Sequence, residues 1–169
     1  MRHILIVSSL SVFLTACGGG SSGGSSSPDG RDDYGAATTG QLIDSPVKGI
    51  FYALAPNSTA NANLPLTDIA GKFDYLEGQT VSFFLGSLKI GEALGSEFIT
   101  LDDLIGSENA KTNIARVLLT LDEDSNPDNG ISLSSLVIDK TLSLDMALAD
   151  FDVDPADFDS SSASAFAQE

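Results

Sequence analysis

Short alternations of apolar and polar residues fill the chain between residues 40 and 95. Residues 47–54 are rich in β-branched and aromatic side chains, which favour strands. Phe73 and Tyr75 alternate with polar neighbours after a glycine turn, and residues 80–85 alternate again. Short strands with turn signals about every 8–12 residues predict a mainly β fold, an antiparallel β-sandwich.

After residue 99, the spacing of the apolar residues changes from that of a strand to that of a helix. Thr100 and Asp103 have the spacing of a capping box, which predicts a short helical turn that ends at Gly106. Ser107 is then the N-cap of a second helix over residues 108–121. The apolar positions of this second helix fall on one face: Ala110, Ile114, Val117, Leu118 and Leu121. We therefore expect a helix packed on one side of the sheet.

An acidic segment follows this helix directly. Oxygen-bearing side chains occupy every second position: Asp122, Asp124, Asn126 and Asp128. Ca²⁺ takes about 6–8 oxygen ligands from such loops, but Pro127 and Leu133 stand where an EF-hand has glycine and glutamate. Two interpretations stay open. The four residues either bind Ca²⁺, or they form an acidic turn that ends the helix before a strand at residues 131–133.

In the last third of the chain, the apolar residues have no single repeating spacing. Residues 136–148 allow a strand through Ile138 or a helix through Leu142 and Met146. Aspartates then recur among apolar residues: Asp150, Asp152, Asp154, Asp157 and Asp159. Five carboxylates could form a metal site, but we interpret them as a solvated acidic edge. We expect residues 40–135 to form the domain and residues 136–169 to form an acidic, partly disordered extension.

The N-terminal segment is the most specific feature of the sequence. A short positive start precedes an apolar stretch over residues 4–14, which would span roughly 16 Å as a helix and is too short to cross a membrane. It fits the h-region of a secretory signal peptide over residues 1–16. The Gly/Ser-rich residues 17–39 predict a flexible linker before the first strand.

The end of this signal segment, Leu14-Thr15-Ala16-Cys17, resembles the lipobox of bacterial lipoproteins. The resemblance implies that Cys17 receives a diacylglycerol thioether, that the peptide before it is removed, and that the new N-terminus is acylated with a fatty acid such as palmitate. Gly18, rather than Asp, follows the cysteine. In Gram-negative lipoproteins this resembles a signal for transport to the outer membrane, so we expect a lipid-anchored protein of the cell envelope, at the outer membrane.

The β-rich half carries a second resemblance. It is seen in three runs: D-S-P-V-K-G-I at 44–50, G-K-F-D-Y at 71–75, and E-G-Q-T-V-S-F-F-L-G at 77–86. Together they are similar to the carboxypeptidase-regulatory, prealbumin-like sandwich, and to uncharacterised surface lipoproteins of Gram-negative bacteria. The resemblance covers residues 40–135 and implies a structural or binding module without a catalytic residue.

Composition narrows the function further. The formal net charge of -16 disfavours nucleic-acid binding, because a phosphate backbone would be repelled. The chain has 1 Cys and 1 His, which excludes a disulfide framework and a histidine-based triad. We expect a non-catalytic adhesion or binding module for a protein or glycan ligand. The alternative is a periplasm-facing accessory of envelope assembly or secretion, and Ca²⁺ is the one cofactor left open.

Overall fold

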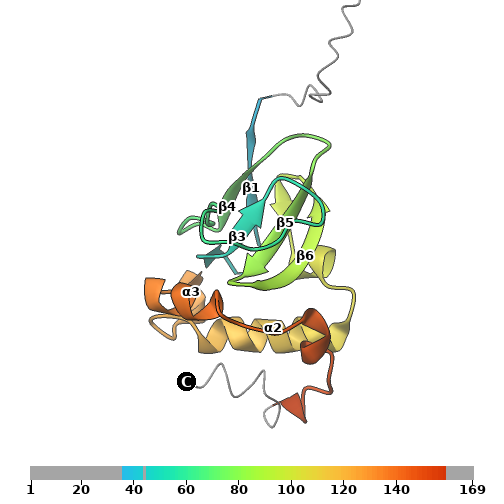
Figure 1. Cartoon of the computed structure of the whole chain (residues 1–169). Coiled ribbons are helices and arrows are strands. Elements are labelled where there is room, and N and C mark those ends of the chain that lie inside the picture. Colours follow the sequence, from blue (N-terminus) through green and yellow to red (C-terminus); the bar gives the residue numbers. More distant parts are fainter. Residues whose placement is uncertain (1–35, 44, 159–169) are drawn as a thin grey trace, which may run out of the picture. The chain divides into compact units, whose positions relative to one another are not determined.

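The computed structural model describes residues 36–43 and 45–158 (Figure 1). The predicted signal peptide, the lipobox, most of the linker and the Ser/Ala-rich residues 159–169 lie outside this part of the chain. The described residues form eight strands, three α-helices and two single-turn 3-10 helices. In chain order they are β1 (Thr38–Leu42), β2 (Val47–Lys48), β3 (Phe51–Ala53), β4 (Lys72–Tyr75), β5 (Thr80–Leu85), β6 (Leu88–Leu94), β7 (Phe98–Ile99), α1 (Leu101–Leu104), α2 (Glu108–Thr120), η1 (Pro127–Asn129), β8 (Ile131–Ser132), α3 (Ser135–Thr141) and η2 (Leu148–Phe151).

The strands form three small sheets, in the orders β4-β1-β7, β3-β5-β6 and β2-β8. The predicted sheet-rich fold with helices is confirmed. The expectation of a purely antiparallel arrangement is wrong, because β1 runs parallel to β7 and β2 runs parallel to β8. These parallel pairs join segments that lie far apart in the sequence, so no turn signal announces them.

The run at residues 47–54, predicted as one strand, is divided into β2 and β3. Gly49 separates them with a φ of +94°, a conformation that side chains with a Cβ rarely adopt. A Cβ at this position would lie 3.0 Å from the Cβ of Leu133. The chain turns at Gly49, so β2 pairs with β8 while β3 joins a different sheet.

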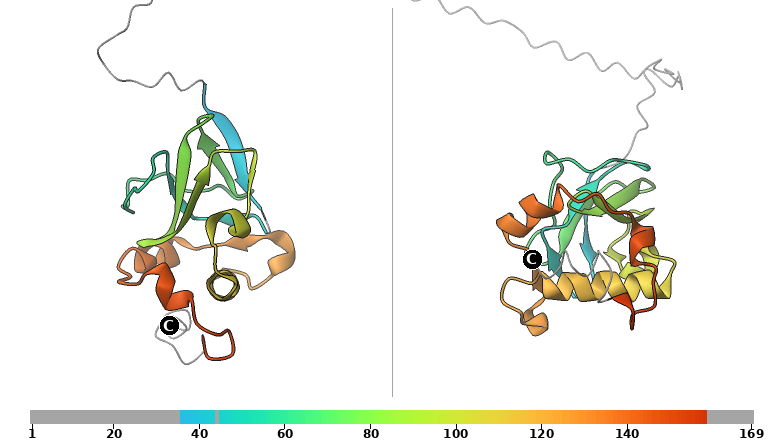
Figure 2. Two further views of the ribbon diagram at one scale, coloured as in Figure 1. Left: turned by 90° about the vertical axis from the view of Figure 1, so that its right-hand side faces the viewer. Right: turned by 60° about the horizontal axis from the view of Figure 1, so that its bottom comes forward.

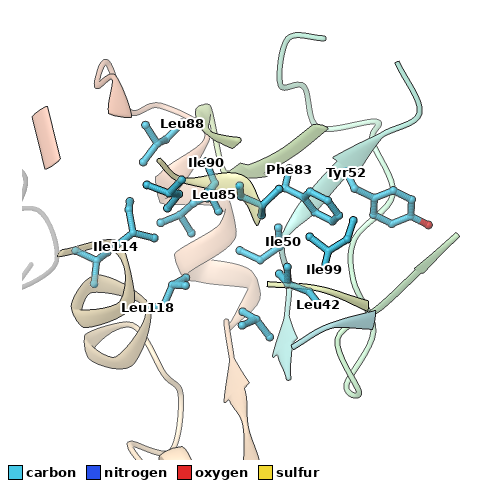
Figure 3. Packing of buried hydrophobic residues seen from close by; sticks show 14 of the residues in the cluster. Leu42, Ile50, Tyr52, Phe83, Leu85, Leu88, Ile90, Ile99, Ile114 and Leu118 are labelled. Atoms are coloured by element: carbon cyan, nitrogen blue, oxygen red, sulfur yellow. The ribbon is translucent and has the colours of Figure 1, made fainter. Parts of the chain in front are cut away.

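The core lies between the sheets and α2. β5 is buried on both faces, and its Phe83 packs edge-on against Phe73 of β4 with ring centroids 5.0 Å apart. α2 lies across one end of the strands rather than flat on a sheet face (Figures 1 and 2). Its buried face carries Ile114 and Leu118, as predicted, and both side chains point toward the strands (Figure 3).

The helix starts follow the predicted local chemistry. Thr100 and Asp103 form the capping box of α1, in which the Thr100 hydroxyl accepts from the Asp103 N–H at 3.2 Å. The reciprocal bond runs from the Thr100 N–H to the Asp103 carboxylate at 2.8 Å. Ser107 caps α2, since its hydroxyl accepts from the Ala110 N–H. Both caps satisfy N–H groups that a helix start would otherwise leave without acceptors.

The described part of the expected acidic extension shares the core of the preceding residues. Neither open alternative for residues 136–148 is present as predicted. The helix α3 covers Ile138, where a strand was possible, and it ends at Thr141, before Leu142 and Met146. Phe151 and Phe158 are buried in the main hydrophobic cluster. The Asn113 amide of α2 donates to the carbonyls of Phe151 and Val153, both at 2.9 Å. Residues 136–158 are therefore part of the folded domain.

The aspartates of this region lie outside that core. All four that the structure describes are exposed, as the predicted acidic edge requires: Asp150, Asp152, Asp154 and Asp157. Asp159 lies outside the described residues.

Candidate functional site

Cys17, the predicted lipidation site, lies outside the described residues. Its modification therefore remains a prediction from the sequence. Within the described residues, no helix has the length and the apolar character needed to cross a membrane.

The acidic loop after α2 is organised around Asp122, the one buried carboxylate of the four predicted ligands. Its Oδ1 accepts from the Ser132 N–H at 2.8 Å, and its Oδ2 accepts from the Asn126 N–H at 3.0 Å. The Glu123 N–H also donates to the Ser132 carbonyl at 2.9 Å. Asp122 thus joins the end of α2 to β8.

Asp124 and Asn126 organise the outer part of this loop. Asp124 Oδ1 accepts from the Asn126 N–H at 2.9 Å, and its Oδ2 accepts from the Asn129 side-chain amide at 2.7 Å. The Asn129 amide, followed by the Asn126 N–H, holds the pKa of Asp124 below its usual value. These hydrogen bonds favour the charged form of the carboxylate.

The four predicted calcium ligands lie in one loop, but oxygens of three of them, Asp122, Asp124 and Asn126, accept hydrogen bonds from backbone N–H groups. Asn126 follows the same pattern, since its Oδ1 accepts from the Asp128 N–H at 3.3 Å. Among the described residues, no group of three or more His, Cys, Asp or Glu side chains is placed to hold a metal ion. The geometry describes the helix-ending acidic turn, and calcium binding stays a prediction.

An apolar hollow opens beside this loop, with a volume of about 150 Å³. Its apolar lining residues come from β1 and the turn after it, β2, α1, α2 and β8, and they include Leu42, Val47, Ala115, Leu118, Leu119 and Ile131. Leu118 on α2 points toward the strands that carry Leu42 (Figure 3). We call this feature the apolar hollow.

A second hollow adjoins the first, with a volume of about 210 Å³. Glu123 and Asp124 line it together with Ile69, and no Lys or Arg is part of its wall. Ile131 lines both hollows, so they are neighbours. We call the second one the acidic hollow.

Sequence patterns did not identify either hollow, because their walls combine side chains from several separate elements. Leu119 was an available signal for the apolar hollow. It is a large apolar residue outside the predicted buried face of α2, and it is 44% exposed. A single exposed apolar side chain is common on protein surfaces. It indicates a binding surface only when a hollow lies beside it.

Comparison with known proteins assigns neither a family nor a function to the chain. No family model, curated protein or solved structure matches the chain. The function must therefore be argued from the residues themselves.

Proposed function

We propose that this chain is a non-catalytic cell-envelope lipoprotein whose β-rich domain acts as an adhesion or binding module. The carrying observation is Leu14-Thr15-Ala16-Cys17 directly after a short apolar stretch, with Cys17 the only cysteine of the chain. Several acyl chains on one cysteine, at about 0.8 kcal/mol per buried CH₂, give an anchor that a single chain would not. Gly18 after the cysteine supports the outer membrane as the location.

The linker and the surface of the domain support a binding role. About 20 Gly-, Ser- and Asp-rich residues separate Cys17 from β1, with a root-mean-square reach of roughly 25 Å as a random coil. Such a linker would hold the domain off the lipid surface. The similarity of residues 40–135 to prealbumin-like binding sandwiches belongs to the same proposal, and the two hollows offer a surface for a ligand.

Cys17→Ser tests the anchor. The chain would be expressed in a Gram-negative host, fractionated, and its N-terminal peptide measured by mass spectrometry. We expect the original chain in the membrane fraction with a lipid mass on Cys17, and the variant released and unprocessed at residue 17. Ser22→Ala in the linker is the matched control and should change neither result. A Cys17→Ser chain that is still cleaved at residue 17 and still bound to membranes would contradict the proposal.

Protease treatment of whole cells tests on which side of the outer membrane the domain lies. An adhesion module must be accessible from outside, so we expect the domain to be degraded in intact cells. Degradation only after the outer membrane is opened would instead favour the periplasm-facing accessory role. A periplasmic protein whose leakage is monitored in parallel is the control for intact cells.

A further inference from the structure

The apolar hollow and the acidic hollow are neighbours that share Ile131 in their walls. We propose that together they bind an extended segment of another protein that carries an apolar side chain close to an arginine or lysine. This inference rests on the proposed function, because it names the recognition surface of the binding module.

The apolar hollow matches the first of these two side chains. Its volume of about 150 Å³ is of the order of one leucine or phenylalanine side chain. The space exists because Ala115 contributes only a methyl group on the side of α2 that also carries Leu119. Leu119 is partly exposed at the rim, so an incoming apolar group would remove it from water.

The acidic hollow matches the second side chain. Glu123 and Asp124 are exposed, and neither forms an ion pair with any residue in the described ranges. The hydrogen bonds that Asp124 accepts come from neutral N–H groups, so its charge is not neutralised. Ile69, beside them, is 74% exposed. Its side chain would cover the aliphatic stem of an arginine or lysine whose charged end reaches the carboxylates.

Charge complementarity favours a foreign segment over the chain's own parts. A second copy would bring another surface with a formal charge of -16 against these carboxylates. Residues 159–169 contain an apolar Phe166 but no Lys or Arg, so they could fill only the apolar hollow. The segment before β1 contains Arg31 close to Tyr34, but three aspartates lie within two residues of Arg31 and would be repelled by the carboxylates of the acidic hollow. A cationic partner satisfies both hollows at once.

The test uses the full-length chain purified from membranes in detergent. The probes are three fluorescein-labelled peptides in which a leucine and an arginine are separated by one, two or three serines. Matched peptides carry serine for leucine or citrulline for arginine, and empty micelles are titrated in parallel. We expect at least one leucine–arginine peptide to bind with a Kd of roughly 10⁻⁴–10⁻³ M, as one side chain and one ion pair allow. Both substituted peptides should bind at least about threefold more weakly.

Paired variants locate the binding. Leu119→Ser should weaken the peptide by about fivefold, while Leu94→Ser, at a position that is 65% exposed on β6, should leave it unchanged. Glu123→Gln should weaken it about two- to threefold at low salt, and this difference should vanish at about 0.5 M NaCl. Glu77→Gln, exposed on a turn away from both hollows, is its control.

Several results would overturn the proposal. Equal binding of the leucine and serine peptides, or equal effects of Leu119→Ser and Leu94→Ser, would show that the hollows are not the site. Binding that appears only after residues 159–169 are deleted would make the chain's own tail the occupant. A dimer that Leu119→Ser dissociates would make it a second copy. In each case, membrane retention of the Leu119→Ser chain would show that the lipoprotein proposal still stands.

Discussion

Asp122 connects two elements through one carboxylate, since it accepts N–H groups from Asn126 and from Ser132 on β8. A buried carboxylate is costly unless its oxygens are satisfied, and here backbone N–H groups satisfy them. The residue therefore has a structural task that does not require a metal ion.

Asp122→Ala should lower the free energy of unfolding by about 1–3 kcal/mol, because the Ser132 N–H loses its acceptor and the Asn126 N–H keeps only Asp124. Denaturant unfolding followed by circular dichroism would measure this change. Asp128→Ala is the matched control, because Asp128 is exposed in the same loop, and it should cost less than about 0.5 kcal/mol. Equal midpoints for the two variants would show that Asp122 does not hold the loop.

The pKa of Asp124 can be tested by titration. Its pKa is lowered by the Asn129 amide and the Asn126 N–H, so NMR titration should place its midpoint below the ordinary value of about 3.9. A lowered pKa contributes stability that is present above the unfolded pKa and is lost as the pH falls through the folded pKa. Asn129→Ala should move the midpoint back toward the ordinary value. An unchanged midpoint in that variant would contradict the assigned cause.

At the scale of elements, the sequence predicted the helix caps correctly but did not predict which distant strands pair. The caps at Thr100 and Ser107 depend on residues only three positions away, so the sequence displays them directly. The parallel pairing of Gln41 with Phe98 joins residues 57 positions apart (98 minus 41), with no turn between them to reveal it.

The helix α3 was ambiguous for a different reason. Its fully buried residue is Thr141, while Leu136 is 66% exposed. The burial of this helix therefore does not follow the hydrophobicity of its residues, so periodicity could not distinguish it from a strand. The two hollows were missed on similar grounds, since no single element contains their walls.

Leu118→Ala tests the packing of α2. Leu118 is buried in the main cluster and also lines the apolar hollow, so the change should cost about 2–5 kcal/mol. Chemical denaturation gives the measurement. Leu119→Ala, one position along on the exposed side, should cost far less. A Leu118→Ala chain with an unaltered midpoint would mean that α2 is not packed against the core.

At the scale of the whole molecule, residues 40–135 and 136–158 unfold together if they share one core. Phe151→Ala should therefore lower the stability of the entire domain by about 3–5 kcal/mol, because Phe151 is 1% exposed in the main cluster. Thermal unfolding followed by near- and far-UV circular dichroism would show one shifted transition. Loss of only the signal from α3 and η2 would instead show two separately folding parts.

Calcium provides the second test at this scale. We predict that about 10 mM Ca²⁺ raises the unfolding free energy by roughly 1.5–3 kcal/mol if the loop at Asp122–Asp128 binds in the range of about 10⁻⁴–10⁻³ M. Melting curves with calcium and with chelator would be compared with those of an Asp122→Asn/Asp124→Asn double variant. Identical melting points with and without calcium would leave the loop as a helix-ending turn.

The order of strands in the first sheet bears on mechanical load. β1 follows the linker directly, and it is the central strand of β4-β1-β7. It is paired with β4 over four residue positions, from Thr38 to Gln41, and with β7 at Gln41 and Leu42. Hydrogen bonds lie across the strand direction in an antiparallel pair such as β1–β4, and they are slanted in a parallel pair such as β1–β7. A pull on the linker along β1 therefore loads these bonds in shear, and they must break together rather than in succession. Under the proposed lipid anchor, drag on the domain would enter at β1, which is paired on both sides.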